Sequence, residues 1–522
     1  MPLPSNFRTR AIQGHSPRGG LLRLAPLLAA LLLAGCASTG PMQSRVQAVQ
    51  PSQLGLSTRA VNPAEFPQED WWTQFNDPEL NRLIAQALAD NPSLQQAQAR
   101  MRQAQAAVGV AQSALEPSLN AAVNSTRQRF SANDIYPPPL GGGVYTENQA
   151  LLQGSYTFDF FGRHKDQLQA AIGQARAAQA EAQAARVVLA ANVAGGYVGL
   201  ARLDAQHAVL QRTLAQRRHI ERLVGDRVRA GLETTLQQRQ AQAEIPQIKL
   251  QLEQNAQAQA QARHALAALL GQGPQATAKL EPDLQTLPLP ALPQSLPAEL
   301  IGRRADVVAA RWQAQAALAG VKAARAAFYP NISLTAFAGF TALGFSQFLA
   351  AGSRAYGVGP ALTLPIFEGG KLRANLRGQA AAADAAIAQY NATVVNAVRE
   401  VADAVSDRRS LQQQIAQQHD ALELAQDAQR LAQQRYKAGL NNYLSVLTTE
   451  NAVLQLQQIG TNLKAQALVD DLALIRALGG GYATSELPAL PGAPADAAPT
   501  AASLQTPTTP AEPATPGAAA RP

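Results

Sequence analysis

The chain has 522 residues, of which 47% are hydrophobic and only 15% are charged, and its formal net charge is +8. Alanine supplies much of the hydrophobic fraction and glutamine is abundant, and both residues favour helix. The basic residues behind the positive charge are scattered, and the predicted strands lack the basic and aromatic pattern of single-strand binders. The composition therefore predicts a helix-rich protein and argues against nucleic acid as a partner.

The N-terminus has the pattern of a targeting segment. Four arginines precede an apolar run over residues 24–33, which is too short to span a membrane in the mature protein. Leu33-Ala34-Gly35-Cys36 then resembles a bacterial lipobox, although a chance cysteine in an ordinary signal peptide would look the same. Because Cys36 is the only cysteine, we predict a lipoprotein signal peptide over 1–35 and a covalent lipid on Cys36, with no other cofactor. Ala37 and Ser38 replace the aspartate that commonly retains such lipoproteins in the inner membrane, so the resemblance implies the outer membrane.

The first half of the chain combines short helices, strands and a long helical hairpin. Residues 36–70 show no sustained period and indicate an N-terminal tether. A first structural repeat is predicted over 71–270. It contains short helices, one of them running to about Glu116, then a β-hairpin over about 117–161 whose return strand starts near Gln149, and a long helical hairpin over about 163–270.

The second half follows the same plan. A Pro-rich connector over 271–297 leads into a second repeat over 298–481, and residues 482–522 are predicted to be a disordered tail rich in Pro, Ala and Thr. This repeat has a helix from about Asp306 to Phe328, a β-hairpin over about 330–367 and a helical hairpin over about 371–478. One face of its last strand is predicted to carry Val358, Pro360, Leu362, Leu364 and Ile366. The long helix that follows would run about 100 Å. It has a coiled-coil-like seam at Tyr390, Val394, Val398, Val401 and Val405.

Sequence landmarks recur in the same order about 210 residues apart, which indicates an internal duplication. The clearest are the turn sequences RVRAGL at 227–232 and RYKAGL at 435–440. Each copy supplies two alternating strands with an apolar face. A membrane barrel must close, because an open edge leaves backbone groups unsatisfied in lipid, and known barrels begin at about eight strands. The four predicted strands cannot close one, so several chains must share a barrel.

Several motifs resemble the TolC-like outer membrane factors, specifically the lipoprotein channels of tripartite drug-efflux pumps. They include WWTQFNDPELNRLIAQAL from Trp71, the stretch RRADVVAARWQAQAALAGVKAARAAFYPNISLTA, RYKAGLNNYLSVL and IRALGGGY. The resemblance implies a mainly α-helical protein with a membrane β-barrel portion, in which a homotrimer shares a twelve-stranded barrel in the outer membrane of a Gram-negative bacterium. It further implies a periplasmic barrel of helices, an equatorial domain, a periplasmic membrane-fusion adaptor protein and a proton-driven inner-membrane transporter as partners.

The chain departs from the family pattern at two places. Ala305 replaces the proline of the RRPDV motif, which should cost little because proline only pre-organises a first helical turn. Where the family commonly has VLDAQ near the periplasmic aperture, this chain has Val446-Leu447-Thr448-Thr449-Glu450, preceded by Ser445. Ser445, Thr448 and Glu450 are therefore the aperture candidates, and the usual carboxylate ring is absent from its expected position. Glu450 lies about 200° around the helix from Thr448, so it should point away from the lumen if Thr448 points into it.

The two turns between the long helices are candidate docking sites. Arg227 and Arg435 lie in the last helical turn, where a cation suits the helix dipole, and Gly231 and Gly439 permit the left-handed conformation that ends a helix. Leu232 and Leu440 just beyond should be exposed unless a partner covers them. The resemblance implies that these tips dock on the adaptor.

No enzyme site is predicted. The six histidines are dispersed, and Gly141-Gly142-Gly143 lacks the Lys-Ser/Thr of a phosphate loop. Arg303, Arg304 and Asp306 are either a charged site or, as we favour, a solvated helix start. Six aromatic residues form either an interfacial girdle or loop packing: Phe130, Tyr136, Tyr145, Phe345, Phe348 and Tyr356.

The predicted function is passive conduction of exported small molecules through an outer-membrane duct, with the energy supplied by a partner. A duct for type I protein secretion is the alternative, since it has the same architecture with different partners. A periplasmic coiled-coil scaffold lipoprotein would explain the helices but not the amphipathic strands.

Overall fold

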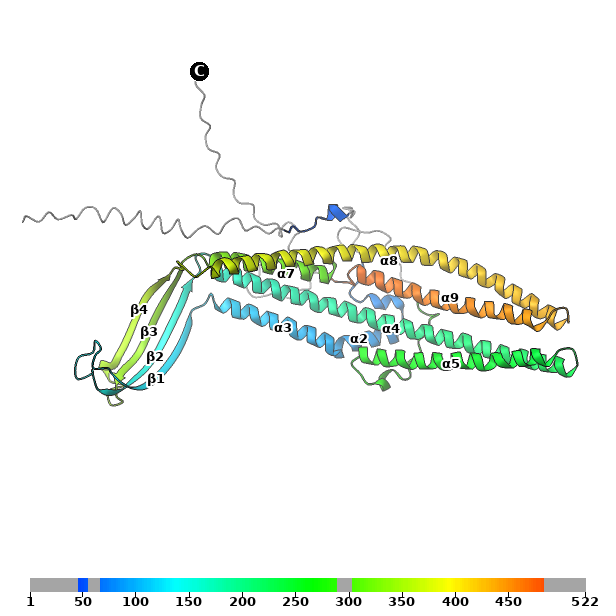
Figure 1. Cartoon of the computed structure of the whole chain (residues 1–522), viewed down its shortest axis with the longest axis horizontal. Coiled ribbons are helices and arrows are strands. Elements are labelled where there is room, and N and C mark those ends of the chain that lie inside the picture. The colour runs from blue at the N-terminus through cyan, green and yellow to red at the C-terminus, as the bar shows by residue number, and fades with distance from the viewer. Residues whose placement is uncertain (1–45, 55–65, 289–302, 483–522) are drawn as a thin grey trace, which may run out of the picture. The chain divides into compact units, whose positions relative to one another are not determined.

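A computed structural model describes residues 46–54, 66–288 and 303–482, shown in Figure 1. The signal peptide, Cys36, most of the connector's second half and the predicted tail after 482 lie outside the described residues. The chain divides into two compact units, and each unit takes segments from both halves of the sequence. The described segments of the first unit are 113–166 and 320–380; those of the second are 46–54, 66–112, 167–288, 303–319 and 381–482.

The first unit contains one antiparallel sheet of four strands in the order β1-β2-β3-β4. The strands are β1 (Ser118–Arg129), β2 (Val144–Phe158), β3 (Asn331–Leu343) and β4 (Arg354–Thr363). The pairing of β2 with β3 joins the two predicted hairpins into one sheet. Within the chain, β1 and β4 are the edges of this sheet.

The register gives the sheet one apolar and one polar face. A representative row runs from Leu119 through Gly154 and Ala336 to Val358. The apolar face also carries Val123, Leu152, Tyr156, Phe158, Leu334, Phe340, Tyr356 and Leu362. Asn120, Asn124, Gln149, Gln153, Ser155, Ser333, Thr335 and Thr341 lie on the other face. The predicted alternation is confirmed in all four strands.

Three strand boundaries differ from the prediction, and one of them is the end of β2, which lies at Phe158 and not near residue 161. Strand β2 begins at Val144, so the return strand starts earlier than Gln149 and pairs with all of β1. Strand β4 ends at Thr363, so the prediction that Leu364 and Ile366 continue it was wrong. Pro365 lies between them, and its lack of an N–H removes a ladder donor just where the alternation of apolar residues continues.

The helices of the two halves have matching lengths, which confirms the duplication. Helices α3 (Pro92–Ser113) and α7 (Ala305–Ala326) have 22 residues each. Helices α4 (Arg163–Arg229) and α8 (Lys371–Lys437) have 67 each, and α5 (Thr235–Leu269) and α9 (Tyr443–Ala477) have 35 each. The first half also has α2 (Pro78–Asp90), and short 3-10 turns lie at Pro51–Leu54 (η1), Trp71–Phe75 (η3), Pro274–Thr277 (η4) and Ala351–Ser353 (η5).

The largest core of the second unit surrounds the middle of α4. Trp71, Phe75 and the apolar face of α2 pack there with the ends of α5 and α9. Leu280, Leu284 and Leu287 join this core, so the described part of the Pro-rich connector is packed structure and more than a linker. Helix α4 also contains an 18-residue window apolar enough to cross a membrane, and 44% of that window is buried inside the chain. Packing within the chain therefore covers less than half of this apolar window.

The seam of α8 is confirmed only in part. Tyr390, Val394 and Val401 are buried as predicted, but Val398 and Val405 are half-buried. Ala397 and Ala404 take the buried positions, which gives a regular four-three spacing. The prediction placed the larger side chain, valine, in the seam at both positions where alanine and valine are neighbours in sequence. Close helix packing favours the alanine there.

Part of the predicted tether is docked on α7 and α8. Ala48 is buried against Val307, Tyr390 and Val394. The Asn391 side chain binds the neighbouring backbone twice, since its Oδ1 accepts from the Val49 N–H at 2.9 Å and its Nδ2 donates to the Gln47 carbonyl at 2.8 Å. These backbone groups are therefore satisfied as they would be in a strand pair.

Candidate functional site

The two helical hairpins turn by the same backbone motif. Gly231 and Gly439 have φ values of 71° and 75°, the left-handed conformation predicted for them. The Leu232 N–H donates to the Arg227 carbonyl and the Leu440 N–H to the Arg435 carbonyl, each at 2.9 Å. Each glycine N–H also donates to the carbonyl three residues before it, at 3.0 Å. These paired bonds form a Schellman motif, which satisfies the last carbonyls of α4 and α8.

Four exposed leucines follow these turns. Leu232 and Leu440 are 66% and 70% exposed, as predicted for a tip without a partner. Leu236 and Leu444, four residues further on, are 63% and 57% exposed. The sequence interpretation missed this second pair, which lies in the first turns of α5 and α9. We call these four residues the tip leucines.

A polar contact joins the two tips. The Arg227 guanidinium lies 4.9 Å from the centroid of the Tyr436 ring, and its Nε lies 3.4 Å from a Glu233 carboxylate oxygen. Burial and the nearby Glu233 carboxylate raise the pKa of Tyr436 well above its usual value. Arg227, predicted as a helix-dipole cation, therefore also bridges α4 to α8, whereas its counterpart Arg435 is exposed.

A buried polar group links all four long helices behind the tips. The Arg217 Nη1 lies 3.0 Å from the Glu450 Oε2, and both side chains are less than 5% exposed. Glu450 Oε1 accepts from Gln216 at 2.7 Å and from Gln433 at 3.2 Å, and the Arg217 Nη2 donates to Asn451 at 2.6 Å. Glu244 of α5 lies 3.9 Å from Arg217. We call this group the polar node: Gln216, Arg217, Glu244, Gln433, Glu450 and Asn451.

The aperture candidates lie at the start of α9 in different environments. Thr448 is exposed, and Ser445 is half-buried, with its hydroxyl bonded to Asn441 at 2.9 Å. Glu450 is buried in the polar node, where burial raises the pKa of its carboxyl although Arg217 opposes the shift. Glu450 and Thr448 thus lie on different sides of α9, and the Glu450 carboxylate is used inside the chain. The role of Ser445 and Thr448 at an aperture stays a prediction.

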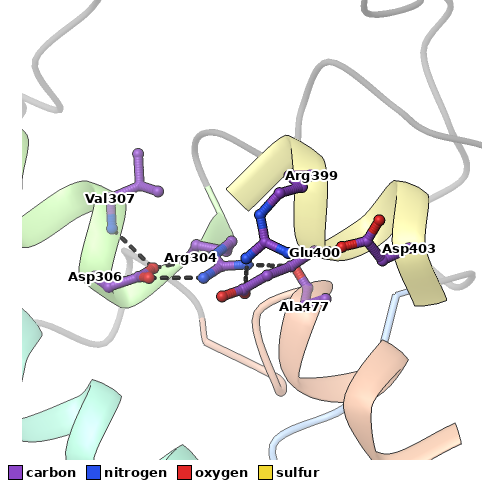
Figure 2. Close-up of polar contacts among 7 residues, drawn as sticks. All are labelled: Arg304, Asp306, Val307, Arg399, Glu400, Asp403 and Ala477. Atoms are coloured by element: carbon purple, nitrogen blue, oxygen red, sulfur yellow. Dashed lines mark hydrogen bonds and ion pairs between the residues drawn. The ribbon is translucent and has the colours of Figure 1, made fainter. Parts of the chain in front are cut away.

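The solvated helix start favoured for Arg303, Arg304 and Asp306 was wrong for Arg304, which is buried (Figure 2). Its Nη2 lies 2.7 Å from Asp306 Oδ2 at the start of α7, and its Nη1 lies 2.8 Å from Glu400 Oε2 on α8. Nη1 also donates to the Ala477 carbonyl at the end of α9, at 3.4 Å. Burial alone would raise the pKa of Asp306, but hydrogen bonding to Arg304 and its positive charge hold it below the usual value. One guanidinium thereby joins three helices, since its planar fork of donors matches two carboxylates.

Three glycines after α9 pack against the same region. Gly479, Gly480 and Gly481 all have positive φ, and a Cβ on Gly479 would collide with the Arg303 carbonyl. The motif IRALGGGY therefore ends in a turn that only glycine fits.

The aromatic residues divide between the two interpretations. The Phe130 ring lies edge-on to the Tyr136 ring, with their centroids 5.2 Å apart, and its centroid lies 6.2 Å from that of Tyr145. These contacts favour loop packing for the three residues. Phe345 and Tyr356 are 71% and 83% exposed, as a girdle requires.

Known proteins match the chain over both halves. The family described as "Outer membrane efflux protein" matches residues 83–272 and 296–480. The chain belongs to this family. The multidrug resistance outer membrane protein MdtP of Escherichia coli is 31% identical over 88% of this chain and 96% of its own length. The outer membrane protein OprJ of Pseudomonas aeruginosa is 34% identical over 88% of this chain and 96% of its own length.

Solved structures of the same kind share the fold. The outer membrane protein VceC of Vibrio cholerae has a TM-score of 0.77 and 36% identity, covering 80% of this chain and all of VceC. The protein is thus an outer-membrane efflux channel of the TolC-like type, with its sheet contributing to a membrane β-barrel and its long helices in the periplasm. The family is one of channels and not of enzymes.

Proposed function

We propose that three copies of this chain close one β-barrel and form the outer-membrane duct of a tripartite efflux pump, through which small molecules pass passively. The register of the sheet carries this proposal. One face is apolar and suits lipid, the opposite face is polar and suits water, and the edges β1 and β4 need partner strands in a membrane. Pairing β1 of one copy with β4 of the next satisfies both edges.

The helices support the same closure. Arg217 on α4 contacts Glu244 on α5 and Glu450 on α9, and Gln433 on α8 contacts Glu450. The order is therefore α5, α4, α9, α8, with α5 and α8 outermost, as Figure 1 shows. Both outer helices also expose leucines away from the tips: Leu250 on α5, and Leu424 and Leu431, seven residues apart, on α8. Such exposed leucines are typical of helices that pack against another chain.

Cysteine cross-linking tests this closure. Leu250 and Leu424 each lie about 20 Å from the tip of their hairpin. In a Cys36→Ser background, which removes the only native thiol, the pair Leu250→Cys with Leu424→Cys should give covalent dimers and trimers on oxidation. Leu250→Cys alone is the control and should stay monomeric under denaturing conditions. A monodisperse monomer in detergent, with no cross-linked trimer, would refute the shared barrel.

The tip leucines are the proposed docking surface for a periplasmic membrane-fusion adaptor, which would join the duct to a proton-driven inner-membrane transporter. Their combined exposure at the two turns favours a partner that buries them. Leu232→Ser with Leu440→Ser should abolish co-purification of the adaptor from the native envelope while leaving the trimer intact. Retained co-purification would exclude the tips as the docking surface.

Efflux is favoured over type I protein secretion because the relatives carry names of multidrug resistance. The scaffold alternative is not supported, since the family is one of channels. Deleting the gene from its host should increase sensitivity to small toxic compounds and leave secreted proteins unchanged. The opposite result would favour secretion. We further propose that Cys36 carries a lipid, and mass spectrometry of the mature N-terminus tests this.

A further inference from the structure

One large apolar side chain lies in the middle of the polar face of the sheet. Phe337 is the central residue of β3 and is 43% exposed. Its neighbours across the ladder are Gln153 on β2 and Gly357 on β4. The ring lies over the glycine, because a Cβ added at Gly357 would be 2.7 Å from Cε1 of Phe337. The missing side chain on β4 thus makes room for the ring, and the part of the ring turned away from Gly357 stays exposed on the polar side of the sheet.

The next row of the ladder extends this apolar surface. It runs from Ala122 through Leu151 and Gly339 to Ala355, and none of its side chains is polar. All other complete rows on this face contain Asn, Gln, Ser or Thr. We call Phe337, Leu151 and their small neighbours Gly339, Ala355 and Gly357 the lumen patch. An exposed phenyl ring in a polar wall has a hydration cost, which contact with an apolar solute removes.

Charge on the same face favours one class of solute. Within the four described strands, the only charged side chain on the polar face is Glu147, which accepts hydrogen bonds from Gln128 and Gln149. A lumen lined by three such carboxylates attracts cations. The face of an aromatic ring also attracts a cation through its quadrupole. An organic cation with apolar groups satisfies both features, whereas an anion satisfies neither.

We propose that Phe337 is the main contact residue of a lumen patch that transiently binds lipophilic organic cations as they cross the barrel. The proposal rests on the shared barrel, because only closure turns the polar face of the sheet into a lumen. In a trimer the patch occurs three times around the wall. Each copy offers an aromatic face beside small residues, so a solute approaches the ring without displacing other side chains.

Photolabelling of the full-length protein in lipid nanodiscs tests the patch. The probe is 4-azidophenyl-trimethylammonium, a cation with one aromatic group, and labelled peptides are identified by mass spectrometry. Phe337→Ala should reduce labelling of the β3 and β4 peptides about 5-fold, the scale of one cation–π contact. Phe337→Tyr keeps the ring and should stay within 2-fold of wild type. Leu334→Ala, on the opposite face of the same strand, is the matched control and should change nothing.

Two results would overturn the proposal: equal labelling of wild type and Phe337→Ala, or no labelling of β3 and β4 in wild type. A probe with the same azidophenyl group but no charge should label these peptides more weakly, and equal labelling would remove the cation from the proposal. Ion conductance of the same preparation in planar bilayers separates a failure of the lumen patch from a failure of the proposed barrel. A conducting trimer with unchanged labelling refutes the patch alone, whereas a preparation that neither conducts nor forms trimers refutes the proposed barrel.

Discussion

Replacing Arg217 by methionine should loosen the four helix ends around the polar node. The substitution keeps an apolar stem of similar length but leaves the Glu450 carboxylate, 4% exposed, without its cation. Breaking a buried ion pair in this way costs about 3 to 5 kcal/mol. Glu450 keeps its bonds to Gln216 and Gln433, so the lower value applies. A loss of about 3 kcal/mol corresponds to a factor of about 150 in the local opening equilibrium.

Hydrogen exchange measured by mass spectrometry reports this opening peptide by peptide. Peptides containing residues 217 and 450 should exchange about 150-fold faster in the variant at pH 7.5. The double variant Arg217→Met with Glu450→Gln removes both charges and should return to within about tenfold of wild type. Asp427→Asn breaks an exposed pair with Arg430, in which both side chains are over 60% exposed, and should have little effect.

The defect should also depend on pH. Burial raises the pKa of Glu450, and the Arg217 charge opposes that shift, so removing Arg217 raises the pKa of Glu450 further. The folded state then binds a proton that the unfolded state has lost, and stability falls as pH rises through this window. The ratio of variant to wild-type exchange should therefore be smaller at pH 5.5 than at pH 7.5. Unchanged exchange in the single variant, or an equal defect in the double variant, would refute this account of the node.

Three further predictions concern other sites. Gly479→Ala should destabilise the protein by about 3 kcal/mol, because the new Cβ collides with the Arg303 carbonyl and the φ of this residue is strained for alanine. Gly195→Ala in α4 meets open space and should stabilise the protein by about 0.5 to 1 kcal/mol. Thermal unfolding measures both changes. Burial raises the pKa of Asp471 to about 6 against the opposing charge of Arg408, with Asp470 adding to the shift. Asp471→Asn should therefore raise the unfolding temperature at pH 7.5 but not at pH 5, and an equal fall at both would contradict the shift. Thr448→Asp should increase cation selectivity in bilayers, and identical reversal potentials would show that this position does not control the lumen.

The sequence was sufficient for features that depend on local periodicity and turn chemistry. The alternation in β1 and β3, the glycine turns and the long helices all follow from residues near one another in the chain. The sequence was insufficient for residue types such as alanine, which occur both inside a helix seam and outside it. Ala397 and Ala404 fill the α8 seam because close packing selects small side chains, which a search for large apolar residues misses.

Long-range pairing was the second limit. Arg304 is buried because Glu400, far away in sequence, supplies a carboxylate, and no local pattern shows such a partner. The polar node depends in the same way on Arg217 and Glu450 meeting across two halves of the chain. The β2–β3 pairing likewise joins two hairpins that are far apart in sequence, and no local pattern predicts that they pair. The exposed pair Leu236 and Leu444, in contrast, was accessible to local reasoning and was missed.

The packing of Ala48 on α7 and α8 sets an upper limit on the distance between Cys36 and these helices. Cys36 lies twelve residues before Ala48, and a fully extended stretch of that length spans at most about 40 Å. If Cys36 is lipidated as proposed, the site where Ala48 packs against α7 and α8 must lie within that distance of the bilayer surface. Deleting residues between Cys36 and Ala48 would shorten this segment and should pull Ala48 away from α7 and α8. Inserting residues there should leave the packing of Ala48 unchanged. Because Asn391 binds the backbone at Gln47 and Val49, the number of residues before this attachment point limits the distance between the proposed lipid and α8.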